Sequence, residues 1–324
     1  MALLFDTFTT RDHLTIRWGY AAASTSPVRG SVLFLNGRTE YMEKYAEVVE
    51  ELNERGLAVT SLDWRGQGLS DRMLTDSQKG HVACFEDYLD DLDLLMTIVH
   101  RHGAPSPTIV LGHSMGGHMA LRFVERHPEQ FDRVILTSPM IDIQLPGFLP
   151  RAWLRWLAHT AAQRGLQGAY VLGAGGVGAR DRRFDGNPLT SDRVRFERNV
   201  EMIRRTPQLA VGGVTYGWLD AAMRSIDRVA APAFARSLRV PILMVTAAQD
   251  QIVCLRAQAQ FWRQAPDCRH VSIAGARHEL LVETDDRRAQ FWRAFDDFSP
   301  CEALPVIGDH VVPDWLARQL RQKV

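Results

Sequence analysis

Residues 108–117 read Thr-Ile-Val-Leu-Gly-His-Ser-Met-Gly-Gly and indicate the fold of this 324-residue chain more strongly than any other segment. The first four residues predict a buried strand, and an apolar-periodic helix is expected from about residue 115 until Pro128 stops it. A serine flanked by small residues between a strand and a helix is typical of a sharp turn at the carboxyl end of a sheet. We therefore predict that Ser114 is a nucleophile. The alternative is a glycine-rich turn with an incidental serine.

Strands and helices alternate on both sides of this segment. Short β-branched runs are followed by helical patterns, which is typical of consecutive strand-helix-strand units. We therefore predict an α/β fold with a mostly parallel central sheet and flanking helices. The other predicted strands are residues 31–35, 57–63, 134–136, 240–245 and 269–273, and the other predicted helices are 40–54, 85–100, 254–265 and 285–298.

The pattern changes between residues 141 and 235. Strand signals fade there, and helical runs rich in Trp, Arg and Gly replace them. We predict that residues 1–140 and 236–299 form one α/β core, interrupted by a helical insertion at 141–235. The tail, residues 300–324, has apolar side chains at helical spacing and is predicted to be a helix that packs on the core.

Two residues after Ser114 complete a predicted catalytic triad. A serine hydroxyl needs a base to take its proton, and the base needs an acid to orient it. With a serine at such a turn, the chain order is serine, acid, histidine. Asp250 follows the predicted strand 240–245, and His278 lies in the loop after the predicted strand 269–273. Both lie at carboxyl ends of strands, where such a sheet gathers ligands. Taken singly, they would be a helix-capping carboxylate and a surface histidine.

The predicted reaction also needs donors for an oxyanion. The first is the backbone amide of Met115 at the start of the helix, where the helix dipole adds positive potential. The second is expected from the turn 36–39, and we nominate the amide of Arg38. The alternative is that Asn36 and Gly37 are only a turn dipeptide.

The charge balance and the cysteines limit the class of protein. Lys+Arg and Asp+Glu each total 38, so we expect no nucleic-acid partner. The N-terminus has no basic lead, and no apolar run reaches the length of about 20 residues that spans a bilayer. The cysteines lack CxxC spacing, which favours a reducing cytoplasm over disulfides or a zinc site. They are Cys84, Cys254, Cys268 and Cys301.

Two sequence patterns resemble binding sites for a dinucleotide and for a metal ion. Residues 173–178 match G-x-G-x-x-G, but they lie in the insertion and no apolar-periodic helix follows, so we expect a loop rather than a dinucleotide site. Several histidines fall on different predicted elements without convergent spacing, so no metal is expected. We predict neither a cofactor nor a metal. These histidines are His100, His102, His113, His118 and His127.

Four short motifs are recognisable together: Asn36-Gly37-Arg38-Thr39-Glu40-Tyr41, Asp63-Trp64-Arg65-Gly66-Gln67-Gly68-Leu69-Ser70, Gly112-His113-Ser114-Met115-Gly116-Gly117 and Gly275-Ala276-Arg277-His278-Glu279. Over roughly residues 10–298 the chain resembles the monoglyceride lipase and bacterial lysophospholipase family of α/β-hydrolases. The resemblance implies ester hydrolysis of monoacylglycerols or lysophospholipids without a cofactor. It assigns the triad to Ser114, Asp250 and His278 and the oxyanion amides to Arg38 and Met115. It also implies that the insertion is a cap over the active site.

One motif departs from the family pattern. Many members have His-Gly where this chain has Asn36 and Gly37. Because the oxyanion donor is a backbone N–H group, catalysis is expected to survive the change, while the substrate preference of the family carries over less directly to this chain.

The start of the insertion mixes large apolar side chains with arginines, including Trp153 and Trp156. One hypothesis is a lid helix that binds an acyl chain through these tryptophans and touches a membrane or micelle surface, at the inner membrane face. The alternative is that the same side chains pack the insertion onto the core.

The triad predicts acyl transfer through a covalent acyl-enzyme, but it does not identify the acyl group or the acceptor. A carboxylesterase, amidase, lactonase or acyltransferase acting on another substrate is therefore an alternative. A relative that only binds a ligand is a second alternative, although such proteins usually lack a member of the triad.

Overall fold

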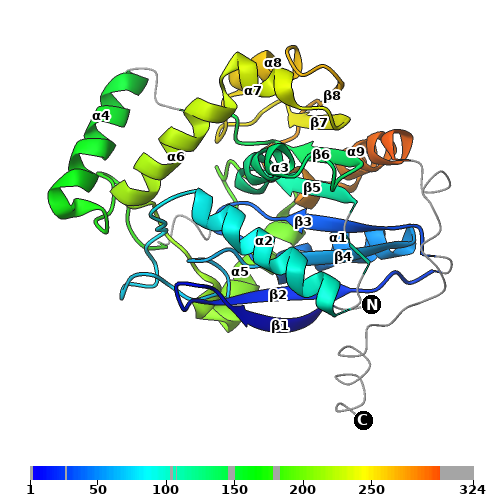
Figure 1. Ribbon diagram of the computed structural model, residues 1–324, viewed down its shortest axis with the longest axis horizontal. Helices are drawn as coiled ribbons and strands as arrows, with labels where there is room; N and C mark the ends of the chain where they lie inside the picture. The colour runs from blue at the N-terminus through cyan, green and yellow to red at the C-terminus, as the bar shows by residue number, and fades with distance from the viewer. Residues whose placement is uncertain are drawn as a thin grey trace, which may run out of the picture.

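The computed structural model describes residues 3–25, 28–102, 105–106, 108–144, 150–177 and 183–299. An eight-stranded sheet forms the centre of this part of the chain (Figure 1). The predicted C-terminal helix at 300–324 lies outside the described residues. The strands, in spatial order, are β1 (Leu4–Thr9), β2 (Thr15–Ala21), β4 (Leu57–Leu62), β3 (Gly30–Leu35), β5 (Ile109–His113), β6 (Arg133–Thr137), β7 (Ile242–Ala247) and β8 (Cys268–Ile273).

The sheet is parallel from β4 to β8 and antiparallel at the other edge. Neighbouring strands from β4 through β3, β5, β6 and β7 to β8 all pair in parallel. At the edge, β2 pairs antiparallel with both β1 and β4. The predicted α/β fold with a mostly parallel sheet is therefore confirmed, and the antiparallel pair β1 and β2 is an addition that the sequence analysis did not predict.

Helices cover both faces of the sheet, because side chains of buried strands point alternately to opposite sides. In β3, Leu33 and Leu35 belong to one hydrophobic cluster, while Val32 and Phe34 belong to the other. The first cluster packs beneath α2 (Glu86–Arg101), α3 (Met115–Arg126) and α8 (Leu255–Trp262), and the second beneath α1 (Ala46–Glu54) and α9 (Asp285–Phe298).

The described part of the segment between β6 and β7, here called the insertion, contains several helices. In Figure 1, α4 and α6 lie side by side and project beyond the sheet. They share a small apolar cluster of Ala158, Leu219 and Met223. The elements of this segment are α4 (Arg151–Ala161), the π-helical turn η2 (Ala162–Leu166), α5 (Arg193–Arg205), η4 (Pro207–Leu209), α6 (Tyr216–Val229) and α7 (Pro232–Ser237).

Helix α6 is held against the core through a buried polar contact. His118 of α3 places Nε2 2.7 Å from the hydroxyl oxygen of Ser225 of α6. Arg122, one turn further along α3, donates to the same oxygen at 2.6 Å. At the other end of the helix, the Thr215 side chain accepts from the Trp218 backbone N–H and caps α6. The buried contact therefore holds the second half of α6 against α3, and the cap stabilises its first turn.

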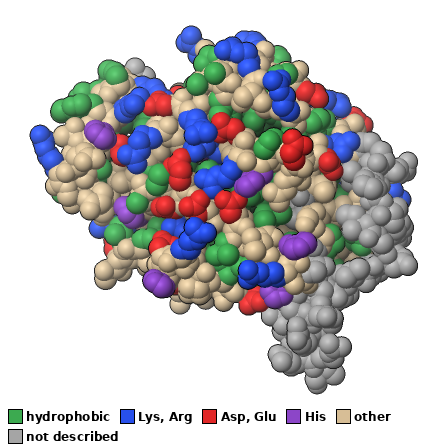
Figure 2. Space-filling model, viewed as in Figure 1, with side chains coloured by type: hydrophobic (Ala, Val, Ile, Leu, Met, Phe, Trp, Pro, Cys, Tyr) green, Lys and Arg blue, Asp and Glu red, His purple; other side chains and the backbone are tan. Residues whose placement is uncertain are grey.

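Charged side chains of both signs are interspersed over the face shown in Figure 2. This agrees with a formal net charge of zero. No helix among the described residues is both long enough and apolar enough to cross a membrane.

Candidate active site

Ser114 lies on the sharp turn between β5 and α3. Its backbone φ and ψ are 52° and −115°, a left-handed conformation that L-residues rarely adopt. The neighbouring glycines allow the close packing around it. A Cβ atom on Gly116 would lie 2.0 Å from the Leu35 carbonyl oxygen, and one on Gly112 would lie 2.6 Å from the Gly116 carbonyl oxygen. The small residues of the motif are therefore required by backbone contacts between β3, β5 and α3.

Ser114, His278 and Asp250 are brought together by loops that follow three different strands. His278 Nε2 lies 2.9 Å from Ser114 Oγ, and His278 Nδ1 lies 2.7 Å from Asp250 Oδ2. All three residues are buried, with exposed fractions of 8%, 4% and 9% for Ser114, His278 and Asp250. The arrangement can pass a proton from the serine hydroxyl to the imidazole while the carboxylate orients the ring.

The Asp250 carboxylate is held in its ionised form. Burial by itself would raise its pKa, but the hydrogen bond and charge of His278, with the N–H groups of Ile252 and Val253, outweigh burial and lower the pKa. These two N–H groups donate to Asp250 Oδ1 at 2.8 and 3.1 Å. One carboxylate oxygen therefore fixes the loop after β7, and the other is left for His278.

The predicted oxyanion donors, Arg38 and Met115, have backbone N–H groups without a partner among the described residues. On either side of Arg38, the Gly37 N–H donates to Glu40 and the Thr39 N–H donates to Gln67. The N–H groups on both sides of Arg38 therefore have acceptors, whereas no acceptor for the Arg38 N–H lies among the described residues. Met115 is the first residue of α3, where the N–H has no intrahelical acceptor and the helix dipole is positive. Both amides are available to an oxyanion.

A buried ion-pair network connects the turn at Gly37 with the residue next to His278. Glu40 accepts from the Gly37 N–H at 2.5 Å and from the Tyr45 hydroxyl at 2.8 Å. Lys44 Nζ donates to Glu40 at 3.0 Å and to Glu279 at 2.6 Å. The sequence analysis missed this network, and chain separation explains why, since Lys44 and Glu279 are 235 positions apart.

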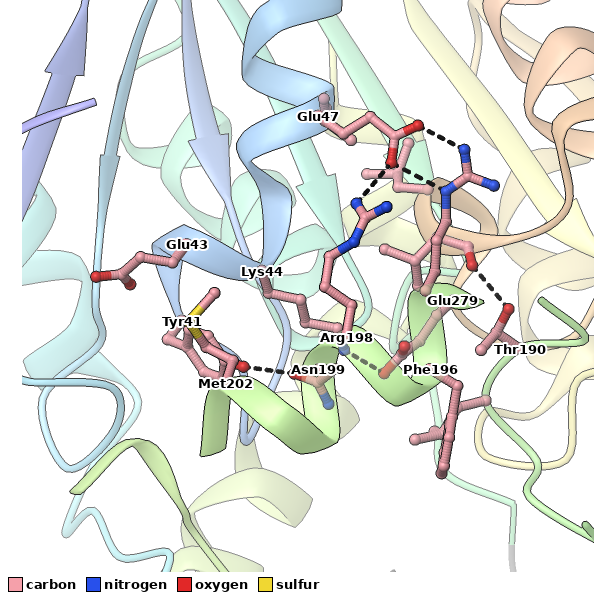
Figure 3. Close-up of a pocket in the computed structure, with 15 residues that line it drawn as sticks. Tyr41, Glu43, Lys44, Glu47, Thr190, Phe196, Arg198, Asn199, Met202 and Glu279 are labelled. Atoms are coloured by element: carbon pink, nitrogen blue, oxygen red, sulfur yellow. Dashed lines mark hydrogen bonds and ion pairs between the residues drawn. The ribbon is translucent and has the colours of Figure 1, made fainter. Parts of the chain in front are cut away.

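Lys44 stabilises the charge of Glu40, whereas burial, with the nearby charge of Glu40, keeps the pKa of Glu279 above its ordinary value. Burial alone would raise the pKa of Glu40, but Lys44 and His113 outweigh burial and hold it at about 2. Burial alone would lower the pKa of Lys44, but Glu279 and Glu40 keep it above its ordinary value. Lys44 and Glu279 also line the pocket in Figure 3, where Tyr41 reaches Asn199 of α5. The network therefore lies between the insertion and the loops that carry Gly37 and His278.

His113, directly before Ser114, is a buried neutral histidine rather than a second base. Burial lowers its pKa to about 4. Its Nδ1 lies 3.1 Å from the Thr137 carbonyl oxygen, and its ring centroid is 4.9 Å from that of His278. A neutral ring beside His278 adds no like charge when His278 takes a proton.

Asn36, where the motif departs from the family pattern, has a structural role. It is fully buried, its side-chain Nδ2 donates to the Leu62 carbonyl at 2.9 Å, and its own carbonyl accepts from Trp64 Nε1 at 2.9 Å. These contacts connect the ends of β3 and β4. The side chain of Asn36 therefore shapes the turn, and the predicted donor remains the backbone of Arg38.

Trp153 and Trp156 lie on the exposed side of α4. Their exposed fractions are 47% and 60%, whereas Ala158 and Ala161 on the opposite side are buried. Trp156 lines a surface pocket with Arg151 and other residues of α4 and α6. The alternative in which both indoles pack the insertion onto the core does not fit this exposure.

The segment matching G-x-G-x-x-G does not follow a strand. Residues 173–177 form an irregular loop, and the Gly213 N–H donates to the Gly175 carbonyl at 2.7 Å, while Gly178 lies outside the described residues. Within the described ranges, no group of three or more His, Cys, Asp or Glu side chains is arranged to hold a metal ion. Cys84, Cys254 and Cys268 are free thiols.

Comparisons with known proteins agree with this geometry. The sequence profile described as serine aminopeptidase, S33, matches residues 26–285. Lysophospholipase L2 of Escherichia coli K12 is 35% identical over 277 residues, which cover 82% of this chain and 79% of that protein. A monoacylglycerol lipase of Mycolicibacterium smegmatis is 24% identical over 262 residues, covering 80% of this chain and 84% of that protein.

Solved structures show the same fold. A soluble variant of monoglyceride lipase from Saccharomyces cerevisiae, crystallised with a substrate analogue, superposes with a TM-score of 0.71 at 18% identity and covers 92% of this chain and 94% of its own. With the family profile and the 35% identical relative, this establishes that the chain belongs to the serine aminopeptidase S33 family of α/β-hydrolases, together with bacterial lysophospholipases and monoglyceride lipases.

Proposed function

We propose that this ester hydrolase cleaves the acyl ester of lysophospholipids, with Ser114 as its nucleophile. The observation that supports the nucleophile most directly is the continuous hydrogen-bonded chain from Ser114 Oγ through His278 to Asp250. The lysophospholipid substrate is supported by the 35% identical relative, which is named lysophospholipase L2.

The proposed reaction follows from the positions of these groups. His278 Nε2 removes the proton from Ser114 as Oγ attacks the ester carbonyl carbon. The negative charge that develops on the carbonyl oxygen is received by the N–H groups of Arg38 and Met115. The imidazolium, oriented by Asp250, then protonates the leaving glycerol oxygen. Water repeats the sequence on the acyl-enzyme and releases the fatty acid.

We further propose that the insertion at residues 141–235 is a cap that brings the enzyme to a lipid surface through α4. Trp153 and Trp156 are one helical turn apart on the exposed side of that helix, next to Arg155. Exposed indoles beside a cation are typical of a helix that lies at a membrane interface. This contact would be peripheral, at the inner face of a membrane, and would hand an acyl chain to the site.

Monoacylglycerols are the second candidate substrates. They are favoured by the relative from Mycolicibacterium smegmatis, which is named monoacylglycerol lipase. The same triad chemistry applies, because only the group attached to the glycerol differs.

The proposal is tested by hydrolysis of oleoyl lysophosphatidylcholine, monooleoylglycerol and p-nitrophenyl butyrate by the wild-type protein and Ser114→Ala. We expect serine-dependent hydrolysis with the highest kcat/KM for the lysophospholipid. Activity confined to the short ester would refute the lipid substrate and retain the triad. Equal activity of Ser114→Ala would refute the nucleophile.

A further inference from the structure

The side chain of Arg38 extends from the predicted oxyanion turn to the insertion. Its Nη1 donates to the Gly212 carbonyl at 2.9 Å, and its guanidinium carbon lies 5.6 Å from the centre of the Trp218 ring. Glycine at position 80 leaves room for it, since a Cβ there would lie 3.0 Å from Arg38 Nη1. The guanidinium thus lies between the core and α6, on the residue whose amide is predicted to receive the oxyanion.

This guanidinium has no carboxylate partner among the described residues. Arg38 forms none of the ion pairs of the described chain. Buried arginines of this protein do have acidic partners, as Arg65 has in Asp91. Burial lowers the pKa of Arg38 to about 10, which still leaves it charged at neutral pH. Four of its five N–H donors are free of described acceptors. Arg38 is partly buried, and a partly buried cation without a described counter-ion favours a ligand that supplies negative charge.

Two more donors lie beside the guanidinium. Trp218 is 5% exposed, and its indole Nε1 makes no hydrogen bond of normal geometry. Tyr88 is 1% exposed, and its hydroxyl interacts with both Trp218 and Arg38. Burial raises the pKa of Tyr88, so its hydroxyl stays protonated. The three side chains come from the oxyanion turn, α2 and α6, and each offers an N–H or O–H group.

We propose that Arg38, Trp218 and Tyr88 form a subsite for the phosphate group of the substrate. Phosphate fits a planar guanidinium fork assisted by neutral donors. In a lysophospholipid, a fixed number of bonds separates the phosphorus from the ester carbonyl carbon. The same number of bonds separates the guanidinium carbon Cζ of Arg38 from its backbone N. The ester at the Arg38 amide and the phosphate at the Arg38 side chain can therefore be held by one residue. This subsite rests on the proposed function, because it assigns the part of the molecule that distinguishes a lysophospholipid from a monoacylglycerol.

The test compares kcat/KM for oleoyl lysophosphatidylcholine with kcat/KM for monooleoylglycerol in excess nonionic detergent. Lysophosphatidylcholine has no net charge, so attraction to a charged micelle does not enter the ratio. We expect Arg38→Met to lower this ratio by about tenfold or more, Trp218→Phe to lower it less, and Arg38→Lys to restore part of it. Damage to the oxyanion turn would lower both rates together and leave the ratio unchanged.

The matched control is Arg72→Met. Arg72 also connects the core to the insertion, through the Gln208 carbonyl at 2.7 Å, and also lacks a carboxylate partner among the described residues. If Arg38 only fastened the insertion through Gly212, the two variants would change the ratio alike. An unchanged ratio in Arg38→Met, or an equal fall in Arg72→Met, would overturn the subsite.

A second measurement separates the subsite from the proposed lipid substrate. Glycerol 3-phosphate and inorganic phosphate are tested as competitive inhibitors of p-nitrophenyl butyrate hydrolysis. We expect inhibition of the wild-type protein that weakens about tenfold in Arg38→Met.

Stronger inhibition by glycerol 3-phosphate would identify the lipid head group as the source of the phosphate, and equal inhibition would identify a free phosphate. If the protein does not cleave lysophosphatidylcholine but this inhibition persists, the proposed function fails and the subsite stands. No inhibition by either compound would overturn the subsite.

Discussion

At the scale of single residues, the turn at Ser114 depends on glycines that admit backbone atoms of neighbouring elements. A Cβ on Gly116 would meet the carbonyl oxygens of Leu35 and Asn36 at 2.0 and 2.5 Å, and neither can move without shifting β3. We expect Gly116→Ala to lower the free energy of unfolding by about 1–3 kcal/mol and to abolish esterase activity. Urea denaturation and an ester assay measure both effects.

The matched control for this substitution is Gly175→Ala, because a Cβ on Gly175 would meet no atom within 4 Å. It is expected to leave stability and activity near those of the wild-type protein. A Gly116→Ala protein with normal stability and activity would contradict the packing described for the turn.

The role of Asp250 can be separated from its contribution to folding. Asp250→Asn retains the shape of the side chain but removes the charge that orients and stabilises the His278 imidazolium. We expect kcat to fall by on the order of 10⁴-fold. Circular dichroism should show an intact fold. A fall of only a few-fold would indicate that another carboxylate orients His278.

The three residues predicted as a triad could be selected from the sequence because each follows a recognisable strand in the expected chain order, and the structure places them within hydrogen-bond distance of one another. Glu40, Lys44 and Glu279 could not be found in this way. Their partners lie on different elements, and nothing in the spacing of a sequence signals that a lysine will be buried between two distant carboxyl groups. That Arg38 lacks a carboxylate partner among the described residues is also visible only once its surroundings are known.

At the scale of elements, the contact between α3 and α6 depends on a histidine that stays neutral. Burial lowers the pKa of His118 from 6.5 to about 4. Between pH 6.5 and about pH 4, His118 is therefore protonated in the unfolded chain but neutral in the folded chain. Because the unfolded chain binds the additional proton, the free energy of unfolding falls as the pH decreases through this range. The loss for one such group is up to about 3 kcal/mol.

The variant that tests this dependence is His118→Asn. Chemical denaturation at pH 7.5, 6 and 5 should show a shallower loss of stability in the variant than in the wild-type protein. Other groups titrate in both proteins. The difference between the two proteins in how steeply the free energy of unfolding falls with pH therefore reports the contribution of His118. Equal slopes would show that His118 is not held neutral in the folded state.

The parallel strands were predicted within a few residues, because their apolar runs are continuous and bounded by turn residues. The antiparallel strands β1 and β2 were not predicted. In β2, Gly19 interrupts the pattern, and it is needed there because a Cβ would lie only 3.2 Å from Met42 and Phe5 side-chain atoms. In β1 the apolar positions are partly exposed, as on an edge strand.

At the scale of the whole molecule, the insertion exposes its aromatic side chains on α4 rather than burying them. We expect the double variant Trp153→Ser with Trp156→Ser to bind phospholipid vesicles about tenfold more weakly and to retain hydrolysis of p-nitrophenyl butyrate. Vesicle sedimentation measures the binding.

The matched control is Leu172→Ser, which removes an 88% exposed apolar side chain from the same insertion but not from α4. This variant should bind vesicles like the wild-type protein. If the double variant binds vesicles as well as the wild-type protein, α4 does not contact the membrane. If the double variant and Leu172→Ser weaken binding equally, the attraction is a general property of the surface.

The helical character of the insertion was evident from the sequence, but the arrangement of its helices was not. Helix α6 packs on the core through apolar residues at helical spacing, including Ile226 and Val229. Other contacts of the insertion are made through backbone groups, such as the Gly80 N–H with the Gly213 carbonyl at 3.0 Å, and through isolated polar pairs such as His118 with Ser225. Neither leaves a periodic pattern. The strand ends that carry the triad are different, since the geometry of a parallel sheet fixes where they meet.

The most direct test of the mechanism is to react the protein with a fluorophosphonate and to map the adduct by tandem mass spectrometry while esterase activity is followed. We predict a single adduct on Ser114, formed in step with loss of activity, slowed by oleoyl lysophosphatidylcholine and absent from Ser114→Ala. Full activity in a protein without this adduct, or an adduct on another residue that accounts for the inactivation, would contradict Ser114 as the nucleophile.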